Sequence, residues 1–222
     1  MRLASRRGHR QVVRVLCERG ANVDAKDEKG GVTPLLAAAS ENRVDVVAEL
    51  LAHQPDLEVQ ARPHNMTIHG TALHHACDKG FVDVAALLCD AGANLEAATH
   101  ISLCTPLLYA CETGGPEMVR LLLSRGARSE ARNLLRDTGL HLAARGGQPS
   151  HTSVGRLQLE HSPALLEACD VRHATPLLAA CSRGCVEFAA MLLLGGANVE
   201  AADTMQRTVR SLPFLCPLFL LP

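Results

Sequence analysis

Aromatic side chains are scarce in this sequence. Among 222 residues there is no tryptophan, one tyrosine and only four phenylalanines. A single large core normally contains more rings, because each ring buries a large apolar area. Thin helix layers closed by alanine and leucine need fewer rings, so the composition favours a layered architecture over one large core.

The sequence also lacks an excess of either charge. It has 22 Lys and Arg against 23 Asp and Glu, a formal net charge of -1. No overall field therefore favours nucleic acid or an anionic membrane surface. A basic cluster near the N-terminus is interpreted as a solvated helix face; it comprises Arg2, Arg6, Arg7, Arg10 and Arg14. We expect no nucleic-acid partner.

No apolar run is long enough to cross a bilayer. The most apolar segment, 212–222, is too short for the about 20 residues of a spanning helix, and three prolines interrupt it. The charged N-terminus does not resemble a signal peptide, and the nine cysteines have no regular disulfide spacing. These features predict an intracellular protein of the cytoplasm or nucleus, without membrane insertion.

A sequence pattern repeats instead. Five segments begin with threonine followed by an apolar, alanine-rich stretch, at intervals of 33 to 38 residues: Thr33, Thr71, Thr105, Thr138 and Thr175. A fixed period in this range is the signature of a stacked repeat array.

Each repeat predicts two helices. Thr caps the first, Pro follows it in three repeats, and Asn or Gly stands nine residues after the Thr, where a left-handed stop is tolerated. Paired apolar residues then mark one face of a second helix, which ends at a second glycine, as at Gly92, Gly126 and Gly196. A polar loop leads to the next Thr.

Thr-Pro-Leu-His with Ala-Ala, a Gly, a Leu-Leu pair and Gly-Ala-Asn resembles the ankyrin repeat, most closely over 71–97. The resemblance implies an all-α solenoid of helix-turn-helix units with projecting β-turn or finger loops, and a concave face made by the fingers and first helices. It also implies a non-enzymatic protein-protein interaction module acting as an adaptor or scaffold.

The repeats predict the following domain boundaries: an array over 1–203 comprising 1–25 (partial), 27–59, 63–97, 99–131, 134–168 (degenerate) and 171–202, then an apolar, proline-rich tail over 204–222 that we expect to be disordered or non-native. In repeat five, the apolar-poor stretch 148–155 is expected to displace the second helix, leaving 156–160 as its remnant. We expect this repeat to be the least stable, since each repeat is supported only by its neighbours.

Candidates for chemistry have structural explanations. Cys77, Cys111 and Cys181 occupy the same repeat position as alanines elsewhere, which indicates a small apolar role between layers. His74 is the repeat histidine of the family, which implies a hydrogen bond to loop backbone. A metal site built from His69, His74, His75 and Cys77 remains an alternative. No nucleotide-binding or hydrolase motif occurs, so we expect no catalysis, cofactor, metal or small-molecule substrate.

The candidate partner-binding residues lie at first-helix positions four, seven and eight, which vary between repeats and are expected to point away from the stacking faces. Tyr109, flanked by His75, Asp78 and Glu112, is the expected contact centre, because tyrosine is enriched at interface hot spots. The remaining candidates on this face are Lys79, Thr113, Arg145 and Arg183.

The longest finger, 62–69, adds two apolar candidates, Met66 and Ile68. An exposed apolar loop tip is a plausible docking element. The alternative is that both side chains fold back on the neighbouring finger.

Two alternatives to a free-standing adaptor stay open. The array could recognise substrates for a larger assembly such as a ubiquitin ligase, which would need a C-terminal recruitment box of about forty residues that we expect this chain has no room for. The shortened first repeat and the apolar tail also suggest a fragment or alternative product of a longer repeat protein, without independent function.

Overall fold

The structure is a computed structural model that describes residues 1–27, 30–61 and 69–211. The described residues form α-helices, two short 3₁₀ helices and turns, with one isolated antiparallel bridge between Ala61 and Gly70 and no strand. The expectation of an all-α fold is confirmed. None of the described helices combines the length and apolarity needed to cross a bilayer.

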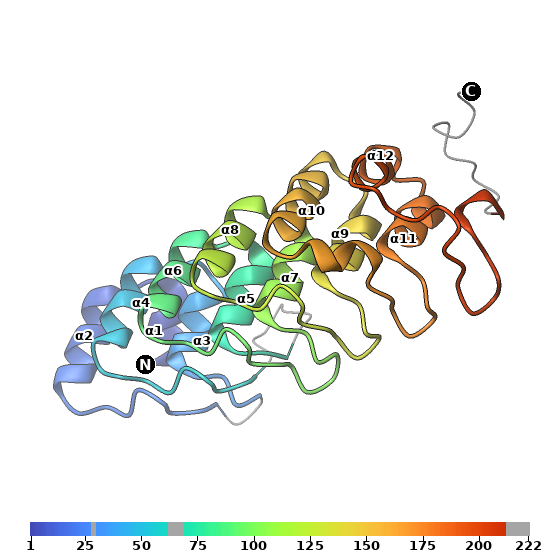
Figure 1. The fold of residues 1–222 in the computed structure, drawn as a ribbon. Helices are drawn as coiled ribbons and strands as arrows, with labels where there is room; N and C mark the ends of the chain where they lie inside the picture. Colours follow the sequence, from blue (N-terminus) through green and yellow to red (C-terminus); the bar gives the residue numbers. More distant parts are fainter. Residues whose placement is uncertain (28–29, 62–68, 212–222) are drawn as a thin grey trace. The chain divides into compact units, whose positions relative to one another are not determined.

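The chain forms two compact units, Met1–Ile101 and Ser102–Pro222, and each is described by itself. The first contains helices α1 to α6: α1 (Arg2–Arg7), α2 (Arg10–Glu18), α3 (Pro34–Ala39), α4 (Val44–Leu51), α5 (Ala72–Lys79) and α6 (Val82–Asp90). The odd-numbered helices pack in one row and the even-numbered helices in another (Figure 1).

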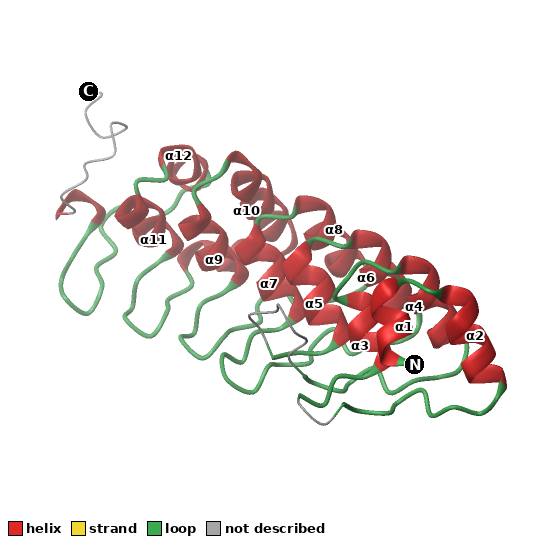
Figure 2. Ribbon diagram, turned by 180° about the vertical axis from the view of Figure 1, so that it is seen from behind, coloured by secondary structure: helices red, strands yellow, loops and turns green. Residues whose placement is uncertain are grey.

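The second unit repeats this two-row arrangement with six α-helices and two 3₁₀ helices: α7 (Pro106–Thr113), α8 (Pro116–Ser124), α9 (Gly139–Gly146), α10 (Pro149–His161), η1 (Pro163–Glu167), α11 (Pro176–Arg183), α12 (Val186–Leu194) and η2 (Val209–Ser211). α9 packs between α7 and α11, and α10 packs between α8 and α12. The connecting loops project as a row of fingers on the side of the first helices (Figure 2).

The predicted helix signals operate as expected. Thr33 and Thr105 accept the backbone N–H of the residue three positions later, at 3.3 and 3.4 Å. Thr71 and Thr138 form capping boxes in which histidine replaces the usual glutamate. The first helices stop at left-handed residues, with φ of 55 to 72° at Asn42, Gly80, Gly114, Gly147 and Gly184.

The prediction for repeat five was wrong. α10 begins at Pro149 and runs for 13 residues to His161, so the 148–155 stretch does not displace the second helix. The apolar pattern missed it because polar side chains fill two of its core positions. His151 Nε2 lies 3.1 Å from the Glu112 carbonyl oxygen, and Gln158 Nε2 lies 3.2 Å from Cys111 Sγ.

Glycines make room for this longer helix. A Cβ on Gly155 would lie 2.7 Å from Phe188 Cζ of α12. A Cβ on Gly139 would lie 2.7 Å from Cys111 Sγ. Repeat five therefore lacks the N-terminal proline of its neighbours because the side chains of α7 and α10 occupy that space.

Candidate protein-interaction site

The fingers of the second unit share one turn geometry. The residue two positions before each Thr has a left-handed φ of 54 to 60°, at Leu103, Arg136, His173 and Gln206. A carboxylate or amide oxygen closes three of the turns by accepting two backbone N–H groups. At Asp170, these donors are Arg172 at 2.7 Å and Ala174 at 2.9 Å. In these three loops, an Asn or Asp in the sequence thus fixes the conformation of the tip.

Neighbouring fingers are joined by backbone hydrogen bonds. The N–H of Leu134 donates to the Ser102 carbonyl at 2.8 Å, that of Val171 to Leu135 at 3.0 Å, and that of Thr204 to Arg172 at 2.8 Å. The bond recurs at equivalent positions from one finger to the next. The four tips are therefore held in register, and little ordering of the loops remains for a partner to impose.

These tips expose apolar side chains. The fingertip strip, as we name it, comprises Leu103, Leu134, Leu135, Val171 and Met205. Met205 is 71% exposed and Leu134 is 58% exposed, although leucine and methionine usually bury most of their surface. The sequence prediction missed this strip. Its signal was present, since each polar finger contains an apolar residue at the left-handed position or within two residues of it.

Arginine–aspartate ion pairs stabilise the same fingers. Arg145 donates to both carboxylate oxygens of Asp137, at 2.7 and 2.6 Å, and its Nη2 lies 3.4 Å from Asp170 Oδ2. The hydrogen bonds to Asp137 raise the pKa of Arg145. Arg207 forms a comparable pair with Asp203 inside its own finger, at 2.6 Å. Arg145, predicted to contact a partner, thus also holds two fingers together.

Position four of the first helix is not exposed, contrary to the prediction. His75 is fully buried and Tyr109 is 8% exposed. The preceding finger covers each side chain: His75 Nε2 lies 3.0 Å from the Ala61 carbonyl oxygen, and the Tyr109 hydroxyl lies 3.4 Å from Ser102 Oγ. Tyr109 therefore presents little surface to a partner. The predicted cluster also contains residues of both units: His75 and Asp78 belong to the first, and Tyr109 and Glu112 to the second.

The other predicted residues are more accessible. Lys79, Glu112, Thr113 and Arg183 are exposed, and Asp78 is half-buried with its carboxylate 3.2 Å from the Lys79 ammonium group. Met66 and Ile68 lie outside the described residues. Binding by any of these residues stays a prediction.

The cysteines and histidines have structural roles. Cys77, Cys111 and Cys181 are buried and form no disulfide among the described residues, and burial raises the pKa of Cys111 to about 12. His141 Nδ1 lies 2.9 Å from Thr138 Oγ1, and its Nε2 lies 3.0 Å from the Ala174 carbonyl oxygen. Within the described part of the chain, no group of three or more His, Cys, Asp or Glu residues could hold a metal ion. The described residues of the His69–Cys77 cluster do not form a metal-binding group.

Comparisons with known proteins identify the family. The model for ankyrin repeats in three copies matches residues 1–62 and 61–133, and the ankyrin repeat model matches residues 172–204. The human Ankyrin repeat and SOCS box protein 16 is 33% identical over 207 residues, which cover 90% of this chain and 44% of that protein.

Two further relatives match a shorter part of the chain. The mouse B-cell lymphoma 3 protein homolog is 33% identical over 94 residues, covering 42% of this chain and 20% of that protein. The human Ankyrin repeat and SOCS box protein 11 is 37% identical over 93 residues, covering 42% of this chain and 27% of that protein. The chain thus spans less than half the length of these relatives. The repeat pattern, the helix-pair fold and the family models agree, and the chain belongs to the ankyrin repeat family.

Proposed function

We propose that this chain is a non-enzymatic adaptor or scaffold that binds a protein partner through the fingers and first helices of its second unit. Ankyrin repeats are protein-protein interaction modules. The fingertip strip is the observation that carries the finer proposal. Exposed apolar groups that lie close together mark interaction sites when the surrounding surface is polar.

The rigidity of the strip supports binding. The three backbone bonds between fingers hold Leu135, Val171 and Met205 at fixed positions before any partner arrives. A partner therefore buries apolar area without the entropic cost of ordering the loops. The buried cysteines form no disulfide among the described residues, which suits a reducing compartment, and we propose that the protein acts in the cytoplasm or nucleus.

The test compares a triple variant at the fingertips with a double variant on α12, both replacing exposed apolar residues by serine. The fingertip variant, Leu135→Ser, Val171→Ser and Met205→Ser, removes three of the five apolar side chains of the fingertip strip. Val186→Ser and Leu194→Ser remove exposed apolar groups of α12 in the same unit. Both proteins and the wild type are used to capture partners from cell extract with quantitative mass spectrometry, after circular dichroism shows equal helicity.

Partners that the fingertip variant loses and the α12 variant retains support the proposal. Equal losses from both variants, or no specific partner for the wild type, contradict it. The second result favours a chain without independent binding function.

Similarity to two proteins whose names pair ankyrin repeats with a SOCS box favours a second candidate. Here the array selects substrates for a ubiquitin ligase. Depletion of the protein from cells then raises the abundance and lifetime of the captured partners. If the lifetimes of the captured partners do not change, the ubiquitin-ligase role is contradicted and the adaptor role is retained.

A further inference from the structure

The fingers of the second unit carry more arginines than carboxylates at their tips, residues 132–137, 169–174 and 203–207. Their tips and the adjacent first helix present five arginines: Arg132, Arg136, Arg145, Arg172 and Arg207. The acidic residues of the same tips are three buried aspartates, Asp137, Asp170 and Asp203. Glu130, Glu167 and Glu200 precede the tips, and Glu112 of α7 acts electrostatically on Arg145. These five arginines and three aspartates together have a net charge of +2, and the aspartates are buried.

The three aspartates are also fully engaged. Asp170 and Asp203 each use one carboxylate oxygen for two backbone N–H groups and the other for an arginine, while Asp137 pairs with Arg145. Arg132 instead donates to two carbonyl oxygens, those of Arg136 at 3.2 Å and Cys169 at 2.7 Å. In the described residues, the guanidinium groups of Arg136 and Arg172 form no ion pair or hydrogen bond.

A hollow of about 120 Å³ lies among these charges. Its charged walls are Arg145, Asp170, Arg172, Asp203 and Arg207, and Ala174, Leu178, Ala179 and Ser182 complete it. Small-molecule sites usually measure about 300–1,000 Å³. The hollow therefore suits a single side chain that belongs to a larger partner.

We infer that the partner of the second unit presents an acidic segment, one carboxylate of which enters this hollow and pairs with Arg172 while flanking apolar side chains contact the fingertip strip. This inference rests on the proposed function. Arg172 is the group of the hollow whose charge is unmatched, and a carboxylate accepts two parallel bonds from a guanidinium. The exposed leucines and Met205 favour a polypeptide, since nucleic acid offers no aliphatic side chains for them.

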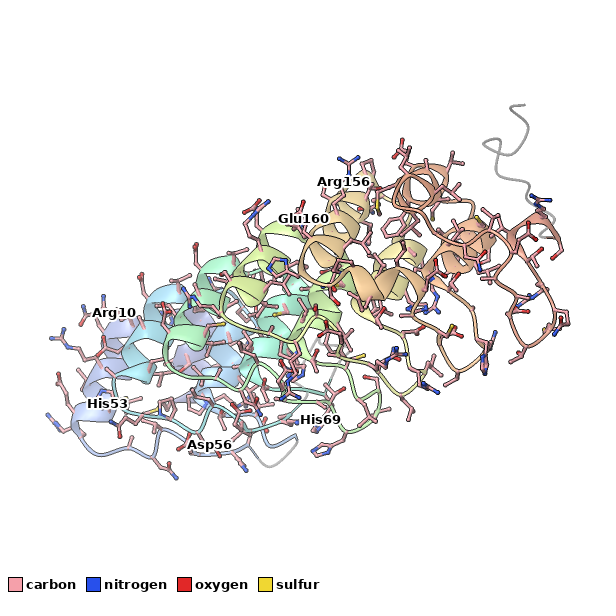
Figure 3. All side chains as sticks on the ribbon, in the orientation of Figure 1. Arg10, His53, Asp56, His69, Arg156 and Glu160 are labelled. Carbon is pink, nitrogen blue, oxygen red and sulfur yellow. The ribbon has the colours of Figure 1, made fainter. Side chains whose placement is uncertain are left out.

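Peptide display provides the test, with the full chain as bait and random 12-residue peptides as probes. We expect the enriched peptides to contain more Asp and Glu than the starting library, together with aliphatic residues. Individual peptides are then titrated against the wild type, Arg172→Glu and the control Arg156→Glu. Arg156 is an exposed arginine of α10, on the helix side away from the fingers (Figure 3).

Arg172→Glu should weaken acidic peptides by roughly tenfold and reduce the salt dependence of binding, whereas Arg156→Glu should leave the affinity unchanged. A peptide with Lys in place of its key acidic residue should prefer Arg172→Glu over the wild type. That swap distinguishes a direct pair from a general loss of folding.

Enriched peptides without an acidic bias, or equal effects of the two charge reversals, overturn the inference and leave the interaction module standing. Peptides that bind the fingertip triple variant as well as the wild type overturn the proposed function and the inference together. Single-stranded RNA that binds through Arg172, with no acidic peptide doing so, also overturns the inference.

Discussion

At the scale of single residues, Arg145 is a predicted contact residue that also has a structural role. Its side chain is 29% exposed, and it neutralises Asp137, which is 1% exposed. Removing one partner of a buried ion pair leaves an uncompensated charge, which costs about 3–5 kcal/mol when the pair is fully buried. The partial exposure of Arg145 reduces this figure.

We predict that Arg145→Met lowers the free energy of unfolding by about 2–3 kcal/mol, because the Asp137 carboxylate loses its bidentate partner. Urea denaturation followed by circular dichroism measures the change. Arg172→Met is the control, since this side chain has no partner among the described residues and should change stability by less than about 0.5 kcal/mol. Similar decreases in the free energy of unfolding of both variants would contradict a stabilising role of the Arg145–Asp137 ion pair.

Two buried histidines predict an acid sensitivity. Burial lowers the pKa of His75 and His141 below the usual 6.5, so the folded chain binds fewer protons than the unfolded chain as the pH falls through 6.5. The free energy of unfolding is therefore at its full value above pH 6.5, as far as these two histidines are concerned, and it decreases as the pH falls below 6.5. We expect the urea concentration at the unfolding midpoint to decrease as the pH is lowered from 7 toward the pKa values of the folded state. His141→Gln should flatten this dependence, while the same change at exposed His53 should not.

At the scale of elements, repeat five shows how one helix changes its neighbours. α10 places Gln158 and His151 in the core positions, and Gly139 replaces a proline to make space. The repeat is thus repacked around polar groups rather than lost. Its N-terminal position should respond to proline differently from the same position in a regular repeat.

We predict opposite effects of proline at two equivalent positions. Gly139→Pro should destabilise the chain by about 1–3 kcal/mol, because the new ring overlaps Cys111 Sγ and Gln158. Ala72→Pro, which follows the capping Thr71, should raise stability by about 0.4–1 kcal/mol by restricting the unfolded chain. Thermal and urea unfolding of both variants measure the difference. If both substitutions change stability in the same direction, packing against α10 is not what excludes proline at position 139.

At the scale of the whole molecule, stability follows from the number of neighbours that each helix has. In the second unit α9 is packed on two sides by α7 and α11, whereas the outer face of α12 exposes Leu194 at 90%. Repeat arrays gain stability largely from such interfaces. The irregular sequence of repeat five predicted low stability there, and the packing of α9 and α10 favours the reverse.

Hydrogen exchange decides between these expectations. We predict that amide protons of α9 and the centre of α10 exchange more slowly than those of α12, because opening them breaks interfaces on two sides. Mass spectrometry of peptic fragments under native conditions measures the rates. Faster exchange in 139–161 than in 186–194 would support the original expectation of a weak fifth repeat.

The sequence by itself determined the family and, outside repeat five, the helix pairs, because those depend on local signals. Thr105 caps, Pro106 starts and Gly114 stops a helix through their own backbone chemistry. A pattern repeated at a constant spacing makes the same local solution recur, and stacking follows from the shared apolar faces.

Only the tertiary structure decided which side chains face solvent and which are already used. His75 and Tyr109 are covered by fingers that precede them in the chain, and Arg145 is occupied by Asp137 and Asp170. The helix of repeat five forms although polar residues fill its core positions, because partners on α7 accept them. The fingertip strip likewise depends on backbone bonds between loops more than thirty residues apart, which no local pattern specifies.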